Sequence, residues 1–257
     1  MTDPRTHPFL DHPRPLAIAH RGGALEGEEN TLPAFMRAVG LGYTHVELDV
    51  HATADGQVVV HHDDTMQRMF GDPRALATLD WDTVRGLRTE GGASAPLLAE
   101  VLESFPELNV AIEAKSDAVV EPLAELLRGM AVLDRVSVGA FAPARTQRLC
   151  AALGPDLCWS PAHAGVARLW LAGWGLPVLR AAGFDVVQVP VQYKGIPVVT
   201  RRFLRAAHAR GIQVQVWTVN AVDEMKRLLD MGVDAIMTDR PSLLRDVMTE
   251  RGAWPAP

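Results

Sequence analysis

The feature that most constrains the fold is a regular alternation between short apolar runs and longer amphipathic segments. Apolar runs at eight places predict β-strands, at residues 16–20, 44–51, 109–115, 135–141, 157–160, 185–190, 212–219 and 235–238. Segments with helical periodicity lie between and after them, at residues 32–40, 118–130, 144–153, 176–182, 200–210, 222–231 and 242–251. Most of the runs are apolar throughout, which is typical of strands buried on both faces of a parallel sheet.

Eight strands that each lead into a helix predict a closed parallel (β/α)8 barrel, the TIM-barrel form of the α/β class. The length agrees, because a chain of 257 residues matches the about 250 residues of one such barrel. Gly183, Gly211 and Gly232 stand where helical patterns give way to strands, as expected for helix C-caps. A doubly wound open sheet is the alternative, since one sequence fixes the number of strands only loosely.

Two segments depart from the alternation. Asp55-Gly56 after the second strand is a hairpin turn signal. From residue 63 to about residue 107 there is then only one short helical pattern, near 99–104, which predicts a small insertion after the second strand. Residues 1–14 contain three prolines and no periodicity, so we expect a flexible N-terminal arm. Residues 15–257 are predicted to form one domain.

Composition excludes several classes of partner. A net charge of -6 and a pI near 5.8 give no basic surface for nucleic acid, and no Lys/Arg cluster suggests an anionic membrane. No run approaches the ~20 apolar residues of a membrane span, so we expect no stable membrane insertion. Cys150 and Cys158 form no disulfide framework, and the N-terminus lacks the apolar stretch of a secretory signal. A cytoplasmic protein is the expectation, and its oligomeric state is left open.

Three acidic residues fall on two predicted strands. Glu47 and Asp49 lie two residues apart, so their side chains share a face that points into a barrel. Two such carboxylates repel each other unless a cation lies between them or one is protonated. Glu113 near the end of the next barrel strand adds a third oxygen ligand, which predicts a site for one divalent metal ion, Mg²⁺ or Ca²⁺. The alternative is that these acids pair with Arg or Lys outside the barrel.

Two histidines and two basic residues accompany these acids. His20 ends the first strand, where barrel enzymes place catalytic groups, and His62 ends the hairpin beside the acidic strand. Two imidazoles can supply a general acid and a general base near neutral pH. Arg21 and Lys115 are suitable donors to a phosphate, although Arg21 could instead pair only with an acid such as Glu29.

Together these residues resemble the glycerophosphodiester phosphodiesterase family. The resemblance spans residues 15 to 248 and is carried by seven motifs in order: His20-Arg21-Gly22, Glu29-Asn30-Thr31, Glu47-Leu48-Asp49-Val50, His62-Asp63-Asp64-Thr65 with Arg68, Ile112-Glu113-Ala114-Lys115, Val216-Trp217-Thr218-Val219-Asn220 and Thr238-Asp239-Arg240-Pro241. One departure is Glu28, where the family usually has proline. It concerns the fit of the substrate rather than the chemistry.

The resemblance implies a metal-dependent enzyme that hydrolyses small-molecule glycerophosphodiesters to sn-glycerol 3-phosphate and an alcohol. Its implied residues are His20 and His62 as the acid/base pair, Arg21 and Lys115 on the phosphate, and Glu47, Asp49 and Glu113 as metal ligands. Trp217 would form an apolar wall for the glycerol or alcohol moiety, or would be a core tryptophan.

Two other functions are open to the same residues. A phospholipase D-like activity on lysophospholipids or sphingolipids would use the same site but need an apolar mouth, which the insertion could supply through Met66, Met69 and Phe70. A non-catalytic phosphodiester-binding protein is disfavoured, because binding alone needs no acid/base pair.

Overall fold

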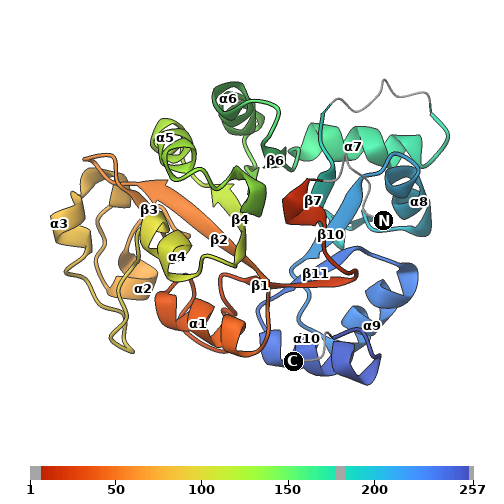
Figure 1. The fold of residues 1–257 in the computed structure, drawn as a ribbon, viewed down its shortest axis with the longest axis horizontal. Coiled ribbons are helices and arrows are strands. Elements are labelled where there is room, and N and C mark those ends of the chain that lie inside the picture. The colour runs from red at the N-terminus through yellow and green to blue at the C-terminus, as the bar shows by residue number, and fades with distance from the viewer. Residues whose placement is uncertain (1–6, 177–182, 255–257) are drawn as a thin grey trace.

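The predicted barrel is confirmed in the computed structural model, which describes residues 7–176 and 183–254 (Figure 1). Eight parallel strands follow one another in the order β6-β5-β4-β2-β1-β11-β10-β7, with β3 (Val58–Val60) paired antiparallel to β2. The eight are β1 (Leu16–His20), β2 (His45–Ala52), β4 (Asn109–Ala114), β5 (Val136–Gly139), β6 (Cys158–Trp159), β7 (Val186–Pro190), β10 (Gln213–Trp217) and β11 (Ala235–Thr238). Every strand predicted from the sequence is present.

The barrel is nearly closed, and the gap lies between β6 and β7. The described parts of these two strands form no ladder with each other, although they are the ends of the sheet. A side chain bridges them instead, because Ser160 Oγ accepts a hydrogen bond of 2.9 Å from the backbone N–H of Gln188. At the seam between β6 and β7 a side chain thus takes the place of a backbone ladder in the wall of the barrel.

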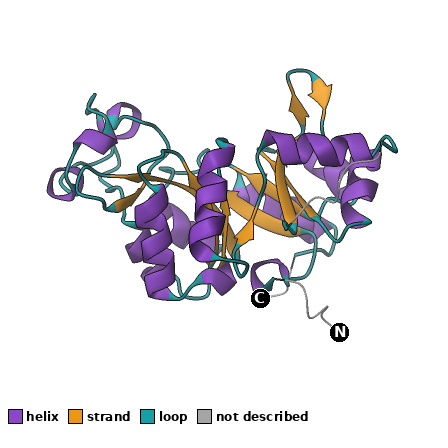
Figure 2. Ribbon diagram, turned by 90° about the horizontal axis from the view of Figure 1, so that it is seen from above, coloured by secondary structure: helices purple, strands orange, loops and turns teal. Residues whose placement is uncertain are grey.

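Helices cover the outside of the sheet (Figure 2). Those that match the predicted segments closely are α1 (Leu32–Gly40), α5 (Val120–Met130), α6 (Pro143–Leu153), α8 (Arg201–His208), α9 (Val222–Met231) and α10 (Pro241–Glu250). The helix predicted at 176–182 lies, apart from Leu176, outside the described residues. A helix that the sequence did not predict, α7 (His163–Ala172), lies across the rim beside the seam, and the hairpin of β8 (Gln192–Tyr193) and β9 (Ile196–Pro197) projects next to it.

The insertion after β2 has a small core of its own. It contains α2 (Gln67–Phe70), η2 (Leu76–Thr78), α3 (Trp81–Val84) and α4 (Leu98–Ser104). The small core consists of Val59, Met66, Leu76, Leu79, Val84 and Ala95, whereas the buried residues of α4 pack in the main core. Glu28 ties the insertion to the barrel, because it accepts hydrogen bonds from Thr89 Oγ1 and from the Gly91 N–H, both at 2.7 Å. The residue that departs from the family pattern thus fixes this insertion in place.

The N-terminal segment differs from the expected arm in its described part. Residues Pro8–Leu10 form a short 3₁₀ helix, η1, with Phe9 and Leu10 buried against Ala111, Cys158 and Val186. Burial lowers the pKa of His45 to about 4, and the neutral ring donates to the Phe9 carbonyl at 3.2 Å. The segment therefore closes the end of the barrel opposite the carboxyl ends of the strands.

This closure predicts a measurable contribution to stability. Phe9→Ala should lower the free energy of unfolding by about 3–5 kcal/mol, the range for removing a buried aromatic ring. The measurement is a urea titration followed by circular dichroism, with Met36→Ala, on the exposed face of α1, as the control. Equal stability of the two variants would show that the Phe9 side chain does not stabilise the fold.

Candidate active site

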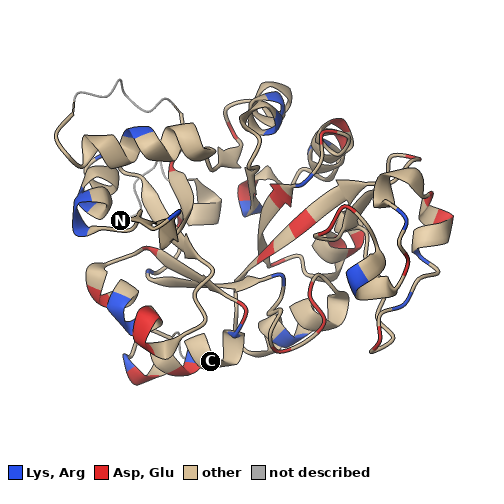
Figure 3. Cartoon of the chain, turned by 180° about the vertical axis from the view of Figure 1, so that it is seen from behind, with Lys and Arg blue, Asp and Glu red and all other residues tan. Residues whose placement is uncertain are grey.

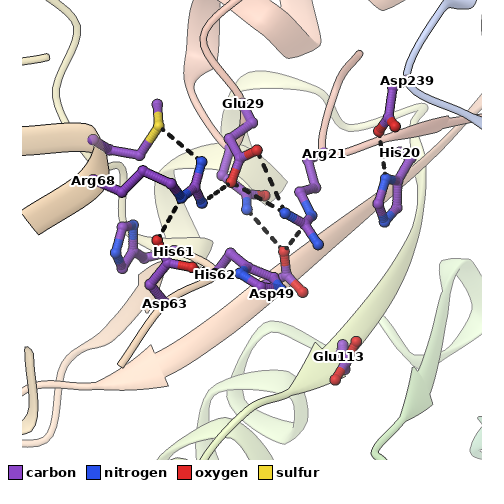
Figure 4. Close-up of polar contacts among 12 residues, drawn as sticks. His20, Arg21, Glu29, Asp49, His61, His62, Asp63, Arg68, Glu113 and Asp239 are labelled. Atoms are coloured by element: carbon purple, nitrogen blue, oxygen red, sulfur yellow. Dashed lines mark hydrogen bonds and ion pairs between the residues drawn. The ribbon is translucent and has the colours of Figure 1, made fainter. Parts of the chain in front are cut away.

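The predicted site residues converge at the carboxyl ends of the strands. His20 ends β1, Glu47 and Asp49 lie on β2, and Glu113 lies on β4. Figure 4 shows His20, Asp49 and Glu113 together with Arg21 and His62. The cavity that they share has a volume of about 650 Å³ and is also lined by Arg21, His62, Lys115 and Trp217. All eight residues selected from the sequence are therefore near one another, and only Asp49 lies behind the cavity surface.

The three carboxylates form a compact cluster. One oxygen from each of Glu47, Asp49 and Glu113 lies within 4.8 Å of the other two. The cluster is close because Asp49 and Glu113 are direct partners in the β2–β4 ladder. Burial and the charge of Asp49 raise the pKa of Glu47 to about 8, which records how unfavourable this cluster of negative charges is without a cation.

The donor set fits a hard divalent cation. Its ligand atoms are all carboxylate oxygens, and Asp49 Oδ1 is buried without a hydrogen-bond donor among the described residues. Lys115 Nζ lies 3.4 Å from this oxygen and 3.1 Å from Glu113 Oε1. The acids do pair with basic groups, but with groups inside the site rather than outside the barrel.

Arg21 connects the carboxylates to the loop that follows β1. Its Nη1 lies 3.2 Å from Glu29 Oε1, and its Nε lies 3.1 Å from Asp49 Oδ2. Asn30 donates to the same Asp49 oxygen at 2.9 Å. The pairing of Arg21 with Glu29, considered from the sequence as an alternative, is therefore present together with a contact to the carboxylate cluster.

The loop is compact because Gly22 has a φ of +77°, and a Cβ at this position would lie 2.8 Å from the Cβ of Ala34. Any larger residue would therefore push the loop, and Arg21 with it, away from α1.

His20 is oriented by an acid from the far end of the chain. Its Nδ1–H donates to Asp239 Oδ1 at 2.6 Å, while Nε2 lies 3.7 Å from Glu47 Oε2. Asn220 holds the other oxygen of Asp239 through a hydrogen bond of 2.7 Å. Burial acts to lower the pKa of His20, but the charge of Glu47 and the bond to Asp239 raise it above its ordinary value. The ring is thus fixed by Nδ1 and presents Nε2 to the carboxylate cluster.

His62 has a similar arrangement. Its Nδ1 lies 2.7 Å from Asp63 Oδ1, and Arg68 Nε donates to Asp63 Oδ2 at 2.7 Å. Burial would raise the pKa of Asp63, but the hydrogen bonds from Arg68 and His62 lower it to about 2. Arg68 Nη2 also lies 2.5 Å from Glu29 Oε1, the oxygen that pairs with Arg21. Glu29 therefore joins the contacts of His62 to those of Arg21.

The neighbouring histidine points elsewhere. His61 is 2% exposed, and its Nε2–H donates to the Thr65 carbonyl at 3.0 Å. Its ring lies 5.7 Å from that of Phe70, inside the insertion. The cavity is lined by His62 and not by His61.

The cavity continues away from the acids into an apolar half. Trp217 stands at the boundary, with its ring 5.8 Å from that of Phe141 and its other side packed against the Leu16 and Met237 cluster. It is therefore both a wall of the cavity and part of the core. Beyond it the lining is largely apolar and comes from α7, β7 and the β8–β9 hairpin: Val166, Ala167, Trp170, Leu171, Val189, Tyr193, Ile196 and Val198.

Several contributing residues had no role assigned from the sequence. The histidines are oriented by four residues that lie within the motifs of the family resemblance: Asp239, Asn220, Asp63 and Arg68. The signal that could have found Asp239 is its position directly after β11, at the carboxyl end of a barrel strand. His51 is a further case, because its Nε2 lies 3.2 Å from the carbonyl oxygen of His62.

Known proteins show the same combination of sequence and fold. The model of the glycerophosphoryl diester phosphodiesterase family matches residues 20–243. A relative from Mycobacterium tuberculosis, "Probable glycerophosphodiester phosphodiesterase 2", is 37% identical over 96% of this chain and 95% of its own length. Human "Lysophospholipase D GDPD1" is 31% identical over 90% of this chain and 85% of its own length.

Solved structures support the same fold at lower identity. The glycerophosphodiester phosphodiesterase from Thermotoga maritima superposes with a TM-score of 0.73 at 24% identity, covering 92% of this chain and 99% of that one. An Oleispira antarctica phosphodiesterase in complex with the product sn-glycerol-3-phosphate superposes with a TM-score of 0.74 at 19% identity, covering 91% and 97%. With the family model matching most of the sequence, the chain belongs to the glycerophosphoryl diester phosphodiesterase family and is a phosphoric diester hydrolase.

Proposed function

We propose that this protein is a metal-dependent phosphodiesterase that hydrolyses glycerophosphodiesters to sn-glycerol 3-phosphate and an alcohol. The observation that carries the proposal is the meeting of two oriented histidines, His20 and His62, with three clustered carboxylates in one cavity. The product bound to the Oleispira antarctica phosphodiesterase supports the same substrate class. A protein that only binds phosphodiesters would need neither histidine.

Each residue of the site has a chemical role in this proposal. Glu47, Asp49 and Glu113 would hold one Mg²⁺ or Ca²⁺, which when bound supplies positive charge next to the phosphate. Arg21 and Lys115 bind phosphate oxygens, the guanidinium through two parallel N–H groups. Of His20 and His62, one takes the proton of the nucleophile, which is water or the 2-hydroxyl of the glycerol moiety, and the other protonates the leaving alcohol. Attack by the 2-hydroxyl gives a cyclic phosphate, which water then opens. Asp239 and Asp63 hold the Nδ1 atoms, so both Nε2 atoms are left for proton transfer.

Removal of metal tests the carboxylate cluster. Dialysis against a chelator should abolish release of glycerol 3-phosphate from glycerophosphocholine, and Mg²⁺ or Ca²⁺ should restore it, because the acids repel one another without a cation. The assay couples glycerol 3-phosphate to a dehydrogenase, with authentic glycerol 3-phosphate as the control for the coupling step. Full turnover by protein shown to be metal-free by elemental analysis would exclude a metal site at these residues.

The adjacent histidines provide a matched pair of variants. His62→Ala should lower kcat by about 10²–10⁴-fold, the range for a lost general acid or base, because His62 lines the cavity. His61→Ala should cost far less in kcat, since His61 contacts Thr65 and Phe70 within the insertion. Both are compared in folded, metal-loaded protein. A larger loss of kcat in His61→Ala than in His62→Ala would contradict the assignment, because it would mean that His61 acts at the phosphate.

The apolar half of the cavity favours a second candidate, phospholipase D-like hydrolysis of lysophospholipids. This half is open to an acyl chain and is continuous with the catalytic half. The insertion does not supply it, contrary to the expectation from the sequence, because Met66 is buried in the core of the insertion and neither Met69 nor Phe70 lines the cavity. The human relative named lysophospholipase D supports this candidate.

A comparison of two substrates separates the candidates. Lysophosphatidylcholine carries an acyl chain that glycerophosphocholine lacks, and Leu171→Asp would place a charge on the apolar wall. If the wall binds the chain, this variant should lower kcat/KM for the lysolipid by about tenfold or more, the cost of one poor apolar contact, with glycerophosphocholine nearly unaffected. Choline release measures both reactions. No turnover of the lysolipid by the wild type would leave only the glycerophosphodiester activity.

A further inference from the structure

The charges of the chain are unevenly distributed along its sequence. Residues 157–222 contain seven Lys and Arg residues but only one acidic residue, Asp185, although the whole chain has a net charge of -6. Asp185 directly precedes β7, so it lies at the end of the barrel away from the catalytic mouth. The segment that builds the apolar half of the cavity is therefore also the basic part of the molecule.

Three basic residues lie on the hairpin and on the helix that follows it. Arg201 and Arg202 begin α8, and Lys194 lies in the turn of the β8–β9 hairpin. Figure 3 shows Lys and Arg on α7 and α8 with few acids near them. Within residues 7–176 and 183–254 no ion pair is formed by any of these three side chains, each of which is exposed. The sequence, which has no Lys/Arg cluster, did not indicate this patch.

Exposed apolar side chains lie beside these charges. Tyr193 is 44% and Ile196 is 56% exposed on the projecting hairpin, and Trp174 is 57% exposed just after α7. Leu171, 38% exposed, completes the group. Arg202 lies over the Trp174 ring at 4.3 Å, and Trp170 of α7 donates to the Pro197 carbonyl of the hairpin at 3.1 Å, so the helix ends and the hairpin form one surface.

This surface surrounds one side of the catalytic cavity. Leu171, Tyr193 and Ile196 are at once exposed and part of the cavity lining, so they form its outer rim. In Figure 2 the hairpin projects beyond α7, away from the two termini. We call this surface the hairpin face, and it comprises Leu171, Trp174, Tyr193, Lys194, Ile196, Arg201 and Arg202.

We propose that the hairpin face docks on anionic phospholipid bilayers, with the mouth of the cavity turned toward the lipid. Aromatic side chains with a polar tip are suited to the headgroup region, and apolar ones beside them remove surface from water. Each Lys or Arg close to an anionic surface strengthens binding by roughly fivefold. No described helix is both long and apolar enough to cross a bilayer. The proposed contact is peripheral, and it depends on the apolar and aromatic side chains together with the basic ones.

A lipid surface fits better than a second copy of the chain. Two hairpin faces placed against each other would bring Lys194, Arg201 and Arg202 of both copies together with no acid between them, which repulsion disfavours. An anionic bilayer supplies the complementary charge and also accepts the apolar hairpin.

The test uses the full chain and sedimentation with vesicles. Vesicles of phosphatidylcholine with about one-third phosphatidylglycerol should bind the protein at least tenfold more tightly than vesicles of phosphatidylcholine alone, and added salt should weaken the binding. Lys194→Glu with Arg201→Glu should reduce binding to the anionic vesicles by about tenfold or more. Tyr193→Ser with Ile196→Ser should also reduce it, without changing the net charge.

A charge-matched control separates this face from general electrostatics. Arg85→Glu with Lys226→Glu makes the same change in net charge at side chains that are 62% and 42% exposed, after α3 and on α9 respectively, and should leave vesicle binding within about twofold. Turnover of dissolved glycerophosphocholine by the Lys194/Arg201 variant should equal that of the wild type, since neither residue lines the cavity.

Three results would overturn the docking proposal. They are no binding of wild type to anionic vesicles, equal losses in the control and the Lys194/Arg201 variant, and a dimer in gel filtration that the Tyr193/Ile196 variant dissociates while vesicles are not bound. Vesicle binding is measured without substrate, so its failure is distinct from a failure of the proposed phosphodiesterase activity.

Discussion

The structure depends on the concentration of negative charge on β2 and β4. Asp49 is fully buried and Glu47 nearly so, in a position where unpaired carboxylates are very unfavourable. Arg21, Asn30 and Lys115 each contact Asp49 and offset part of this cost. When all three carboxylates are ionised they outnumber the two cations, and a bound divalent ion would offset this excess of negative charge. The tight loop after β1 positions Arg21 and Asn30 against Asp49 of this cluster.

Half-buried acids also fix the orientation of the two histidines, His20 and His62. Each is held through Nδ1 by an aspartate, and each aspartate is held in turn by a second side chain, Asn220 for Asp239 and Arg68 for Asp63. A fixed Nδ1–H leaves Nε2 as the free ring nitrogen, and in the proposed mechanism Nε2 is therefore the atom that would exchange a proton. Arg68 and Arg21 both reach Glu29, which couples the insertion to the carboxylate cluster through one residue.

The sequence was informative where backbone periodicity determines the answer. All eight barrel strands were predicted, and the two-residue spacing of Glu47 and Asp49 correctly placed both on one inward face. The helix α7 was missed because its apolar residues do not form a single stripe: Leu169 packs inward, while Val166, Trp170 and Leu171 line the cavity. The burial of Phe9 depends on contacts with β4, β6 and β7, and a local pattern carries no information about such distant partners. The acids that orient the histidines could not be identified from local patterns either, because Asp239 contacts His20 across 219 positions of the sequence.

The incomplete closure of the sheet explains why one half of the cavity is apolar. Between β1, β2 and β4 the ladders are continuous, so the mouth there is shaped by strand-borne acids, histidines and Arg21. At the β6–β7 seam the described residues form apolar contacts, such as that between the Trp159 and Phe184 rings, but the Ser160 bond to Gln188 is the only hydrogen bond described between the two strands' edges. Here α7 lies across the rim instead of following the wall, and the hairpin after β7 rises beside it. The apolar part of the cavity therefore lies beside this gap, and the exposed Leu171, Tyr193 and Ile196 form its rim.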